Sequence, residues 1–375
     1  MKFMRIIYLI LAASSFTFGQ VGFSAHTESG YVSNIYANYR QIPDYVQHFQ
    51  GFLNYDFISS AQGLRTFYQG SATLFEKYNV RNYLMHKIGL SYYRYTHQNK
   101  AKVNAGLDVD GRLYSDDYKW YEYKQGYFYA NIKAIVKPQL YAYVGVNTRI
   151  RSYDNLPPYS YQQNVAFVRL GNFFNSGTSV ITEFNYMQKS YLNKDASPIE
   201  SFSDVQTNGD GQSEQCVGLL RIGQALGAKT GTSAQILLRR NLKSSVRYLI
   251  NDAGYYYSDE ELFDDPFGYN AEQFSLTLKR KLPWSLQASI GGSYTEKHYV
   301  NRLALDLAGV PFEDVSVRDD QRFVGWLSLS KAWKYSSSLA PVTLTLDISV
   351  MKNRSNDLYY NYRTSYFSFG ISQDF

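Results

Sequence analysis

The sequence predicts an all-β fold, an antiparallel up-and-down transmembrane β-barrel of about 16 strands, with 14 or 18 strands as the alternatives. Three observations predict it. From residue 21 onward, segments of about ten to fourteen residues alternate apolar and polar side chains, which gives an extended strand one apolar face. Short turns and longer, more charged loops alternate between these segments. After residue 20 no apolar run is long enough for a membrane helix, so a membrane-spanning chain must close a sheet to satisfy its backbone.

The first 19 residues have the composition of a secretory signal peptide. Lys2 and Arg5 give a positively charged start, residues 6–13 form an apolar core, and small or polar residues precede Gln20. This core is too short to span a bilayer. We expect residues 1–19 to be removed and residues 20–375 to form one barrel domain; a buried N-terminal helix is the alternative.

The composition fits strands that face lipid on one side and water on the other. Hydrophobic residues make up 45% of the chain, yet the mean hydropathy is −0.37. The 37 Tyr have a physical use in the aromatic girdles of a membrane protein. Without Lys2 and Arg5, 36 of the 38 basic residues remain against 32 acidic ones, and so small an excess gives no argument for nucleic-acid binding. A single Cys, Cys216, excludes an intramolecular disulfide.

Five segments show the two-residue period most clearly. They are residues 103–113, 128–136, 140–150, 286–294 and 342–350. In the third, Leu140, Val144 and Ile150 point one way, whereas Tyr143, Asn147 and Arg149 point the other. One face suits lipid and the other suits water.

The gaps between strands predict which end of the barrel each one occupies. Short turns are expected near residues 59–63, 98–101, 137–138, 175–177, 225–231, 282–283 and 335–340. Long loops are expected near residues 40–44, 76–82, 115–121, 154–161, 192–213, 242–272, 300–321 and 353–362. Strict interleaving predicts short periplasmic turns and long external loops. Residues 244–257 are ambiguous between an external hairpin and an extension of the preceding strand.

The last eleven residues read SYFSFGISQDF, and the chain ends on an aromatic residue. Phe367, Phe369, Ile371 and Phe375 share one face of an extended strand. This ending resembles the closing strand of Gram-negative outer-membrane β-barrels, whose terminal Phe is similar to the signal read by the barrel-insertion machinery. The resemblance implies a porin-like barrel in the outer membrane, in contact with membrane lipid and with that machinery. It does not identify a subfamily.

The polar faces of the strands carry more cations than acids. The expected interior cations are Lys87, Arg112, Lys133, Arg149, Arg151, Arg169, Lys189, Arg221, Arg239 and Lys279, and the expected acids are Asp108, Asp110, Glu183 and Asp347. Most of the cations belong to consecutive middle segments and should line one side of the wall, which would bias a wet pore toward anions. The alternative is that ion pairs and hydrogen bonds among these groups fill the barrel.

Three acidic stretches with oxygen ligands raise the question of calcium. The Asp108 and Asp110 carboxylates lie in an alternating strand and cannot wrap around one ion. Residues 207–214 and 258–265 lie in external loops but lack the full spacing of a calcium loop, so we expect solvated loops there. No metal and no cofactor is predicted.

An enzyme is poorly supported, because hydrolysis by a barrel of this kind needs a His near a Ser and an orienting polar group. The five histidines are His26, His48, His86, His97 and His298, and none has a neighbour pattern that suggests a triad. His86 shares a face with Leu84 and Ile88, so its imidazole should point toward lipid.

Aromatic residues are also frequent in the expected external loops. They include Tyr159, Tyr161, Tyr255, Tyr256, Tyr257, Tyr359 and Tyr360. The favoured interpretation is the upper aromatic girdle, and stacking on sugars or on a partner is the alternative.

The sequence favours a passive pore, or the membrane conduit of an uptake or export system, that passes a small hydrophilic solute with or without a periplasmic partner. About sixteen strands leave a lumen wide enough for water. The alternative is a non-conducting structural or adhesive barrel that displays loops or anchors an envelope complex.

Overall fold

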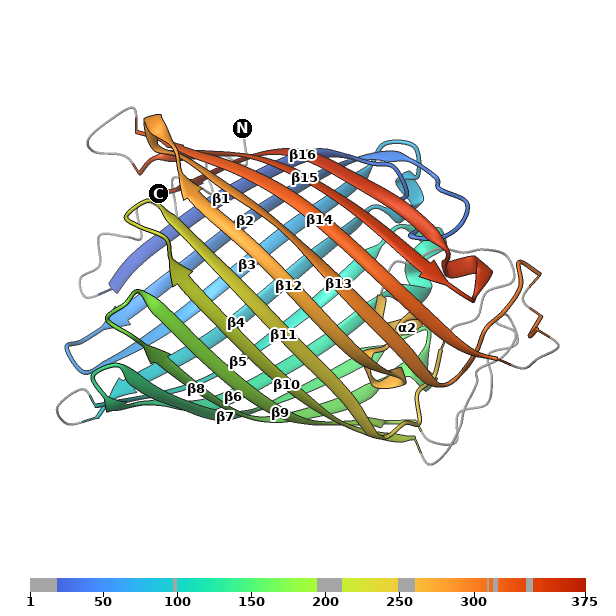
Figure 1. The fold of residues 1–375 in the computed structure, drawn as a ribbon, viewed down its shortest axis with the longest axis horizontal. Coiled ribbons are helices and arrows are strands. Elements are labelled where there is room, and N and C mark those ends of the chain that lie inside the picture. Colours follow the sequence, from blue (N-terminus) through green and yellow to red (C-terminus); the bar gives the residue numbers. More distant parts are fainter. Residues whose placement is uncertain are drawn as a thin grey trace.

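The computed structural model describes residues 19–96, 100–193, 211–248, 260–308, 310–312, 316–334 and 340–375. Sixteen antiparallel strands form one closed barrel, in which each strand pairs with its neighbours in sequence (Figure 1). The ring closes where β1 (Gly19–Val32) pairs with β16 (Tyr362–Asp374). This confirms the predicted fold class and the strand number of 16.

The other strands are β2 (Asp44–Ile58), β3 (Gln62–Phe75), β4 (Tyr83–Tyr95), β5 (Ala101–Tyr114), β6 (Tyr123–Lys137), β7 (Leu140–Tyr153), β8 (Tyr161–Phe173), β9 (Thr178–Tyr191), β10 (Gln212–Ala225), β11 (Thr230–Lys243), β12 (Tyr269–Lys281), β13 (Leu286–Leu303), β14 (Val317–Trp333) and β15 (Val342–Ser355). Short helices occupy the connections: α2 (Glu260–Phe263) and the 3-10 helices η1 (Asn79–Arg81), η3 (Asp116–Tyr121), η4 (Pro157–Tyr159), η5 (Pro266–Gly268), η6 (Pro283–Ser285) and η7 (Leu358–Tyr360). Among the described residues, no helix is both long and apolar enough to cross a membrane.

The connections fall where the sequence predicts them. The five clearest alternating segments lie in β5, β6, β7, β13 and β15, and every predicted gap coincides with a connection. The short turns lie at one end of the barrel together with the C-terminus and the start of β1, and the long loops lie at the other (Figure 1). Gly177 (φ 76°) and Gly227 (φ 109°) supply the left-handed backbone that two of the short turns require.

Two strand ends differ from the expectation. β13 continues to Leu303 and β14 begins at Val317, so the loop predicted over residues 300–321 is shorter than expected. Residues 244–248 form no strand and belong to the connection between β11 and β12, while residues 249–257 lie outside the described part. Residues 1–18 of the expected signal peptide also lie outside it.

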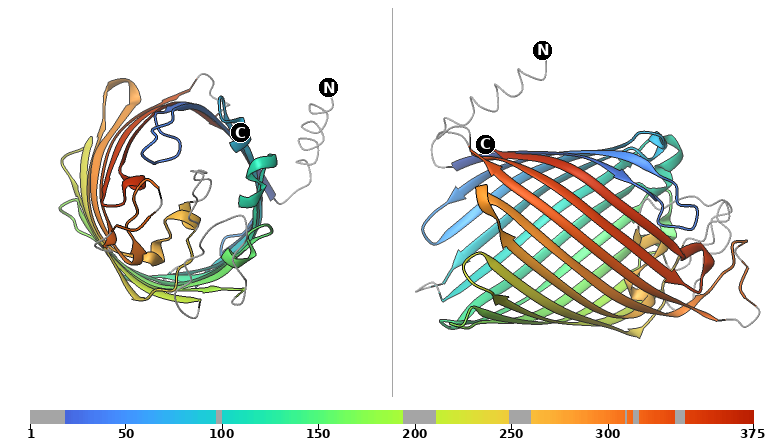
Figure 2. Two further views of the ribbon diagram at one scale, coloured as in Figure 1. Left: turned by 90° about the vertical axis from the view of Figure 1, so that its right-hand side faces the viewer. Right: turned by 45° about the horizontal axis from the view of Figure 1, so that its top comes forward.

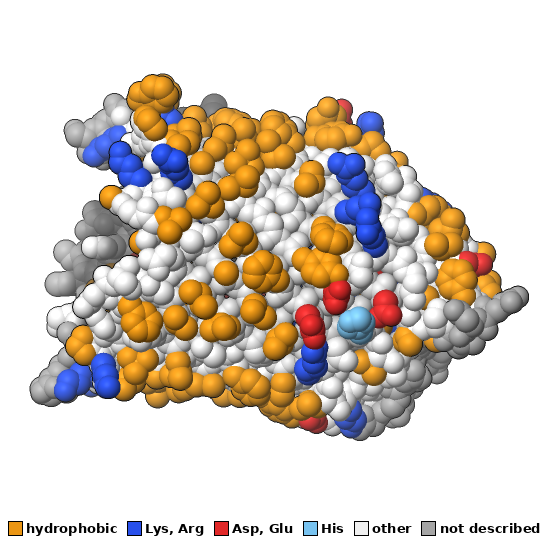
Figure 3. Space-filling view, viewed as in Figure 1, with side chains coloured by type: hydrophobic (Ala, Val, Ile, Leu, Met, Phe, Trp, Pro, Cys, Tyr) orange, Lys and Arg blue, Asp and Glu red, His pale blue; other side chains and the backbone are white. Residues whose placement is uncertain are grey.

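Apolar side chains face outward on the strands and form a belt, one side of which is seen in Figure 3. On β16, Phe367, Phe369 and Ile371 are exposed, whereas Ser368 between them is fully buried. On β7, Val144 and Ile150 are exposed in the same way. Since lipid replaces water around a transmembrane barrel, this exposed belt is the surface that hydrocarbon covers.

The buried aromatic side chains lie inside the barrel near the long loops. The largest group, called here the tyrosine cluster, consists of Tyr114, Tyr118, Tyr121, Tyr123, Tyr153, Leu156, Tyr159, Tyr161, Tyr191, Leu262 and Phe263. The expectation of an upper girdle is therefore wrong for Tyr159, Tyr161 and Tyr360, whose side chains are buried. Tyr159 and Tyr360 lie on η4 and η7, where the long loops carry their rings inward, and Tyr161 begins β8 at an inward-facing position. Tyr255, Tyr256 and Tyr257 lie outside the described residues.

Candidate pore lining and constriction

The predicted interior charges all lie at inward-facing positions of their strands. Alternation from the exposed belt places Arg149 and Arg151 of β7 opposite in direction to Val144 and Ile150. Because directly paired residues on adjacent strands point to the same face, the strand registers extend this assignment to the other strands. The same face therefore holds Lys133, Arg169, Lys189, Arg221, Arg239, Lys279, Asp108, Asp110, Glu183 and Asp347, together with Lys87 and Arg112.

Several of these inward side chains remain accessible to water. The Arg169 side chain is 39% exposed and forms an ion pair of 2.5 Å with Glu183 on β9. Lys87 is 30% exposed and lies 3.0 Å from Asp108 on β5. Nearer the short turns, the Arg221 guanidinium donates to Gln235 at 2.9 Å and is exposed. The middle of the wall is thus polar and wet on its inner side.

Other predicted positions are buried and belong to the packing of the wall. Arg151 is 8% exposed, lies 4.2 Å from the centre of the Tyr123 ring and donates to Gln125. The same Gln125 amide donates to Asp110 at 2.9 Å. Asp108 and Lys189 are also buried. These charges face inward as expected, but their burial keeps them from the surface that a solute would touch.

The inward charges are distributed unevenly around the ring. Accessible cations follow one another on β6, β7, β8, β10, β11 and β12. Asp347 lies on β15, eight strands from β7 in a ring of 16 and so on the facing side of the barrel. Glu28 of β1, which lies 3.5 Å from His26, adds a second carboxylate to that side. Opposite β7 the ring therefore carries the carboxylates Asp347 and Glu28, while the neighbouring β13 and β14 carry Lys297 and Arg322, which bind Asp264.

The described parts of the β11–β12 loop, residues 244–248 and 260–268, fold into the mouth of the barrel. In the left view of Figure 2, the segment with α2 lies within the ring of strands. The sequence DDPFG explains the local turn, because Asp265 caps η5 by accepting a hydrogen bond of 3.0 Å from the Phe267 amide, and Pro266 occupies the first helical position. Leu262 and Phe263 pack into the tyrosine cluster.

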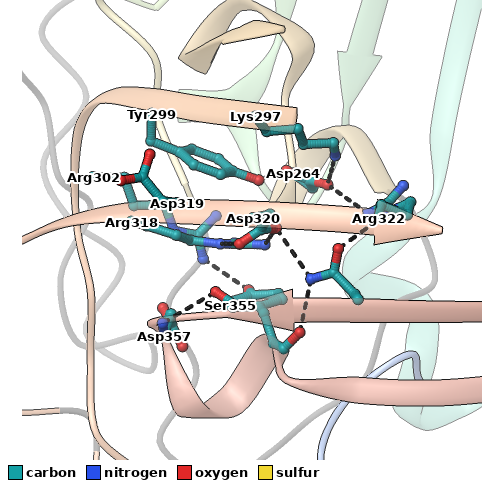
Figure 4. A network of polar contacts seen from close by, with 12 residues as sticks. Asp264, Lys297, Tyr299, Arg302, Arg318, Asp319, Asp320, Arg322, Ser355 and Asp357 are labelled. Carbon is teal, nitrogen blue, oxygen red and sulfur yellow. Dashed lines mark hydrogen bonds and ion pairs between the residues drawn. The ribbon is translucent and has the colours of Figure 1, made fainter. Parts of the chain in front are cut away.

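Two consecutive carboxylates attach this loop to the wall (Figure 4). Asp264 accepts a hydrogen bond from Lys297 of β13 at 2.6 Å and a second one from the Tyr299 hydroxyl. Arg322 of β14 lies 3.4 Å from the same carboxylate. Asp265 forms an ion pair with Lys189 of β9. Asp265 thus attaches the loop to β9, on one side of the β11–β12 hairpin, and Asp264 attaches it to β13 and β14, on the other side. We call these two acids the acid latch.

The expectation of a solvated loop at residues 258–265 is wrong for Asp264 and Asp265. Both are buried, at 4% and 1% exposure, because the inner faces of β9, β13 and β14 supply cations for them. The lower-numbered residues of that stretch, 258 and 259, lie outside the described part, as do residues 207–210 of the other candidate calcium loop. Among the described residues, no group of three or more His, Cys, Asp or Glu could hold a metal ion.

The cations of β13 and β14 were missed by the sequence interpretation. Lys297 and Arg302 lie on β13, and Arg318 and Arg322 lie on β14, within or next to a region assigned to a loop. Arg318 is fully buried, forms an ion pair with Asp320 at 2.9 Å and lies 3.5 Å from the centre of the Tyr360 ring. The two-residue period of Arg318, Asp320 and Arg322 was the signal that could have revealed the strand.

The environment of Asp264 predicts how the acid latch responds to pH. Burial by itself would raise the pKa of this carboxyl, but Lys297, Arg318 and Arg322 outweigh it and hold the pKa below its ordinary value. The stabilising contribution is therefore present above the ordinary carboxylate pKa of about 4 and is lost as the pH falls through the lowered value. We expect the loop to stay attached from pH 7 to about pH 4. Conductance recorded down this pH series would contradict the lowered pKa of Asp264 if it rose between pH 7 and about pH 4 in the wild type but not in Asp264→Asn.

His86 faces outward, as the alternation predicts, and its ring nitrogen lies 2.7 Å from the Tyr68 hydroxyl. His298 is also exposed and pairs with Asp319 at 2.8 Å. His26 and His48 face inward, and their ring centres are 6.4 Å apart. His48 contacts Thr73 at 3.0 Å, which is the only hydroxyl contact of a His found in the described part of the chain besides that of His86.

No family model matches the sequence, and no curated protein matches it. The structure is similar to solved structures from Pseudomonas aeruginosa. For OccK8 (OprE) the TM-score is 0.53 at 11% identity, covering 95% of this chain and 98% of that one. For OpdO it is 0.51 at 11% identity, covering 95% and 97%, and for the outer membrane protein opdK 0.51 at 10% identity, covering 95% and 98%. The chain therefore shares the fold of these proteins, a closed antiparallel β-barrel with an outward apolar belt.

Proposed function

We propose that the protein is a passive outer-membrane pore for small hydrophilic solutes, with a preference for anions. The observation that carries this proposal is the row of inward cations on β6 to β12, facing Asp347 across the ring. A charged wall selects the sign of the ions that pass, and opposed walls create a field across the path.

The proposed pore lining is the accessible part of the charged inner face. It comprises Lys133, Arg149, Arg169, Arg221, Arg239 and Lys279, with Glu183 and Asp347 as acids. We assign Arg151, Lys189, Asp108 and Asp110 a supporting role, since their burial fixes neighbouring side chains and the loop. The acid latch then sets the width of the mouth. No catalytic residue is part of this proposal.

The ends of the chain have roles in assembly under the same proposal. Residues 1–19 direct export, and residues 20–375 form the mature barrel. The Phe375 amide donates a backbone hydrogen bond of 2.7 Å to the Phe23 carbonyl at the β1–β16 seam, and the centres of the two rings are 5.4 Å apart. With Phe367, Phe369 and Ile371, it would present the apolar face that the barrel-insertion machinery reads.

A second candidate is a closed barrel that anchors or displays its loops. The observation in its favour is the tyrosine cluster, which packs Leu262 and Phe263 of the β11–β12 loop against the wall at the long-loop end. A mouth filled in this way could block passage altogether.

Planar bilayers separate the two candidates. Purified full-length protein should give stepwise conductance, whereas heat-denatured protein from the same preparation should give none. Consistent silence from protein whose insertion is verified by protease protection would contradict the pore and favour the anchor.

A further inference from the structure

We propose that Lys352, Arg354 and Arg363 form a binding site for the phosphate groups of a glycolipid in the extracellular leaflet. The three side chains lie on β15 and β16 at outward-facing positions and are exposed. The site is separate from the lumen, because alternation places these residues on the face that carries Val350 and Phe367.

The first observation is a pair of like charges in direct register. Lys352 of β15 lies opposite Arg363 of β16 in the antiparallel ladder. Directly opposed residues have Cβ atoms about 5 Å apart, and like charges at this separation destabilise the pair. Arg354 follows two residues after Lys352 on the same face and adds a third cation. An anion bound between them would remove the repulsion.

The second observation is that no neighbouring carboxylate neutralises these three cations within the described part of the chain. The other cross-strand neighbours of Lys352 and Arg354 are Phe323 and Gln321 of β14. Asp319, the acid of β14 that faces outward nearby, is paired with His298 at 2.8 Å. In the described part of the chain, none of the three cations forms an ion pair with Asp or Glu.

The barrel treats other outward charges differently. Arg240 of β11 and Glu272 of β12 also face outward at the long-loop end, and they form an ion pair. The outward charge of Arg240 is thus neutralised by a carboxylate on the adjacent strand. The cations of β15 and β16 lack such a partner, which favours a ligand from the surroundings.

The third observation is depth in the membrane. Toward the short turns, the outward positions continue with Val350 and Ile348 on β15, and with Ser365 and then Phe367 on β16; Val350, Ile348 and Phe367 are exposed and apolar. The cations therefore stand at the border of the apolar belt on the side of the long loops, which is the extracellular side in such barrels. Figure 3 shows a row of basic side chains bordering hydrophobic ones on this face. Lipid headgroups lie at this level.

The chemistry of the three side chains selects phosphate. Arg354 and Arg363 offer planar forks of N–H donors that match two oxygens of a phosphate, and Lys352 adds a compact positive charge. Phe323 lies beside them, 6.0 Å from the Arg354 guanidinium, and supplies an apolar contact for an acyl chain. We assign the site to a phosphorylated glycolipid rather than to free phosphate because the belt directly adjoins the cations.

Native mass spectrometry of the full-length protein in detergent tests the site. The probes are phosphorylated lipid A and the same lipid after removal of its phosphates. The test variant is the triple Lys352→Gln, Arg354→Gln and Arg363→Gln. Each cation near a phosphate surface contributes about fivefold in affinity, so the triple variant should bind phosphorylated lipid A about 100-fold more weakly than the wild type does. The matched control, Arg94→Gln, Lys100→Gln and Lys137→Gln, makes the same charge change at the short-turn end and should bind like the wild type.

Thermal unfolding of the triple variant and the wild type in neutral detergent shows whether a loss of binding comes from a failure to fold. Without lipid, the triple variant should be as stable as the wild type or more so, because the repulsion between Lys352 and Arg363 is removed. Three results would overturn the proposal: equal binding by the triple variant, equal binding of the dephosphorylated lipid by the wild type, or complete competition by inorganic phosphate at the lipid's own concentration.

Discussion

Replacing Asp264 and Asp265 together by Asn should release the β11–β12 loop and raise the single-channel conductance. The change removes the carboxylates that Asp264 and Asp265 offer to Lys297 and Lys189, and both lysine side chains are about as buried as these acids. Removing one partner of a buried ion pair destabilises the folded arrangement by about 3–5 kcal/mol. Because two such pairs are broken, we expect the loop to lose its inward position. Bilayer recordings give the conductance, and a protease directed at residues 244–268 gives the position of the loop.

The matched control is Asp154→Asn in the loop between β7 and β8. Asp154 pairs with Lys124 at 2.7 Å, but the two side chains are 51% and 72% exposed. An exposed pair contributes about 0–1 kcal/mol, so conductance and protease access should stay those of the wild type. If the double variant keeps both wild-type readings, the acids do not hold the loop. Protease access answers this even if the barrel proves silent in bilayers.

Replacing Arg149, Arg169 and Arg239 by Gln should shift the reversal potential in a salt gradient toward cation selectivity. These residues lie on the inner faces of β7, β8 and β11. A unit charge about 10 Å from a passing ion in water contributes about 0.4 kcal/mol, so each cation removed lowers anion permeability by a factor of about two. Together the three changes should lower anion permeability about eightfold at low salt, and the anion-to-cation ratio should fall further because cation permeability rises. Glu183, left without Arg169, acts in the same direction.

The effect should shrink at high salt, because the Debye length falls to about 3 Å at 1 M. Lys124→Gln is the control, since this exposed cation belongs to the outer end of β6 and its charge is paired with Asp154. Reversal potentials that do not differ between the triple variant and the wild type would remove the cationic wall as the source of selectivity. Conductance itself would remain, so the pore and its selectivity are tested separately.

The strands and turns were open to prediction because their pattern is local. In β7 the alternation of Val144 and Ile150 with Tyr143 and Arg149 fixes both the strand and its direction of facing. The turns at Gly177 and Gly227 mark short connections in the same local way. Inward placement of the charged residues followed from the same period, without knowledge of the partner strands.

The fate of each inward charge was not open to prediction. Arg151 and Arg169 occupy equivalent positions in the alternation of adjacent strands, yet one is buried against Tyr123 and the other is exposed. The difference comes from height in the barrel, because the loops and the tyrosine cluster cover only the long-loop end. Asp264 and Asp265 were interpreted as solvated for a related reason: their partners Lys297 and Lys189 lie 33 and 76 residues away along the chain.

By itself, the sequence determined a closed antiparallel ring, an approximate number of strands (about 16, with 14 and 18 left open) and the alternation of its short turns with its long loops. Those properties follow from a two-residue period and from turn chemistry, both of which act between neighbours in the chain. The tertiary structure alone decided which loop enters the mouth and which tyrosine side chains are buried in the interior. It also decided that Lys352 lies opposite Arg363 on the outer face. These outcomes depend on contacts between residues distant in sequence, which form only when the ring closes and brings its walls and loops together.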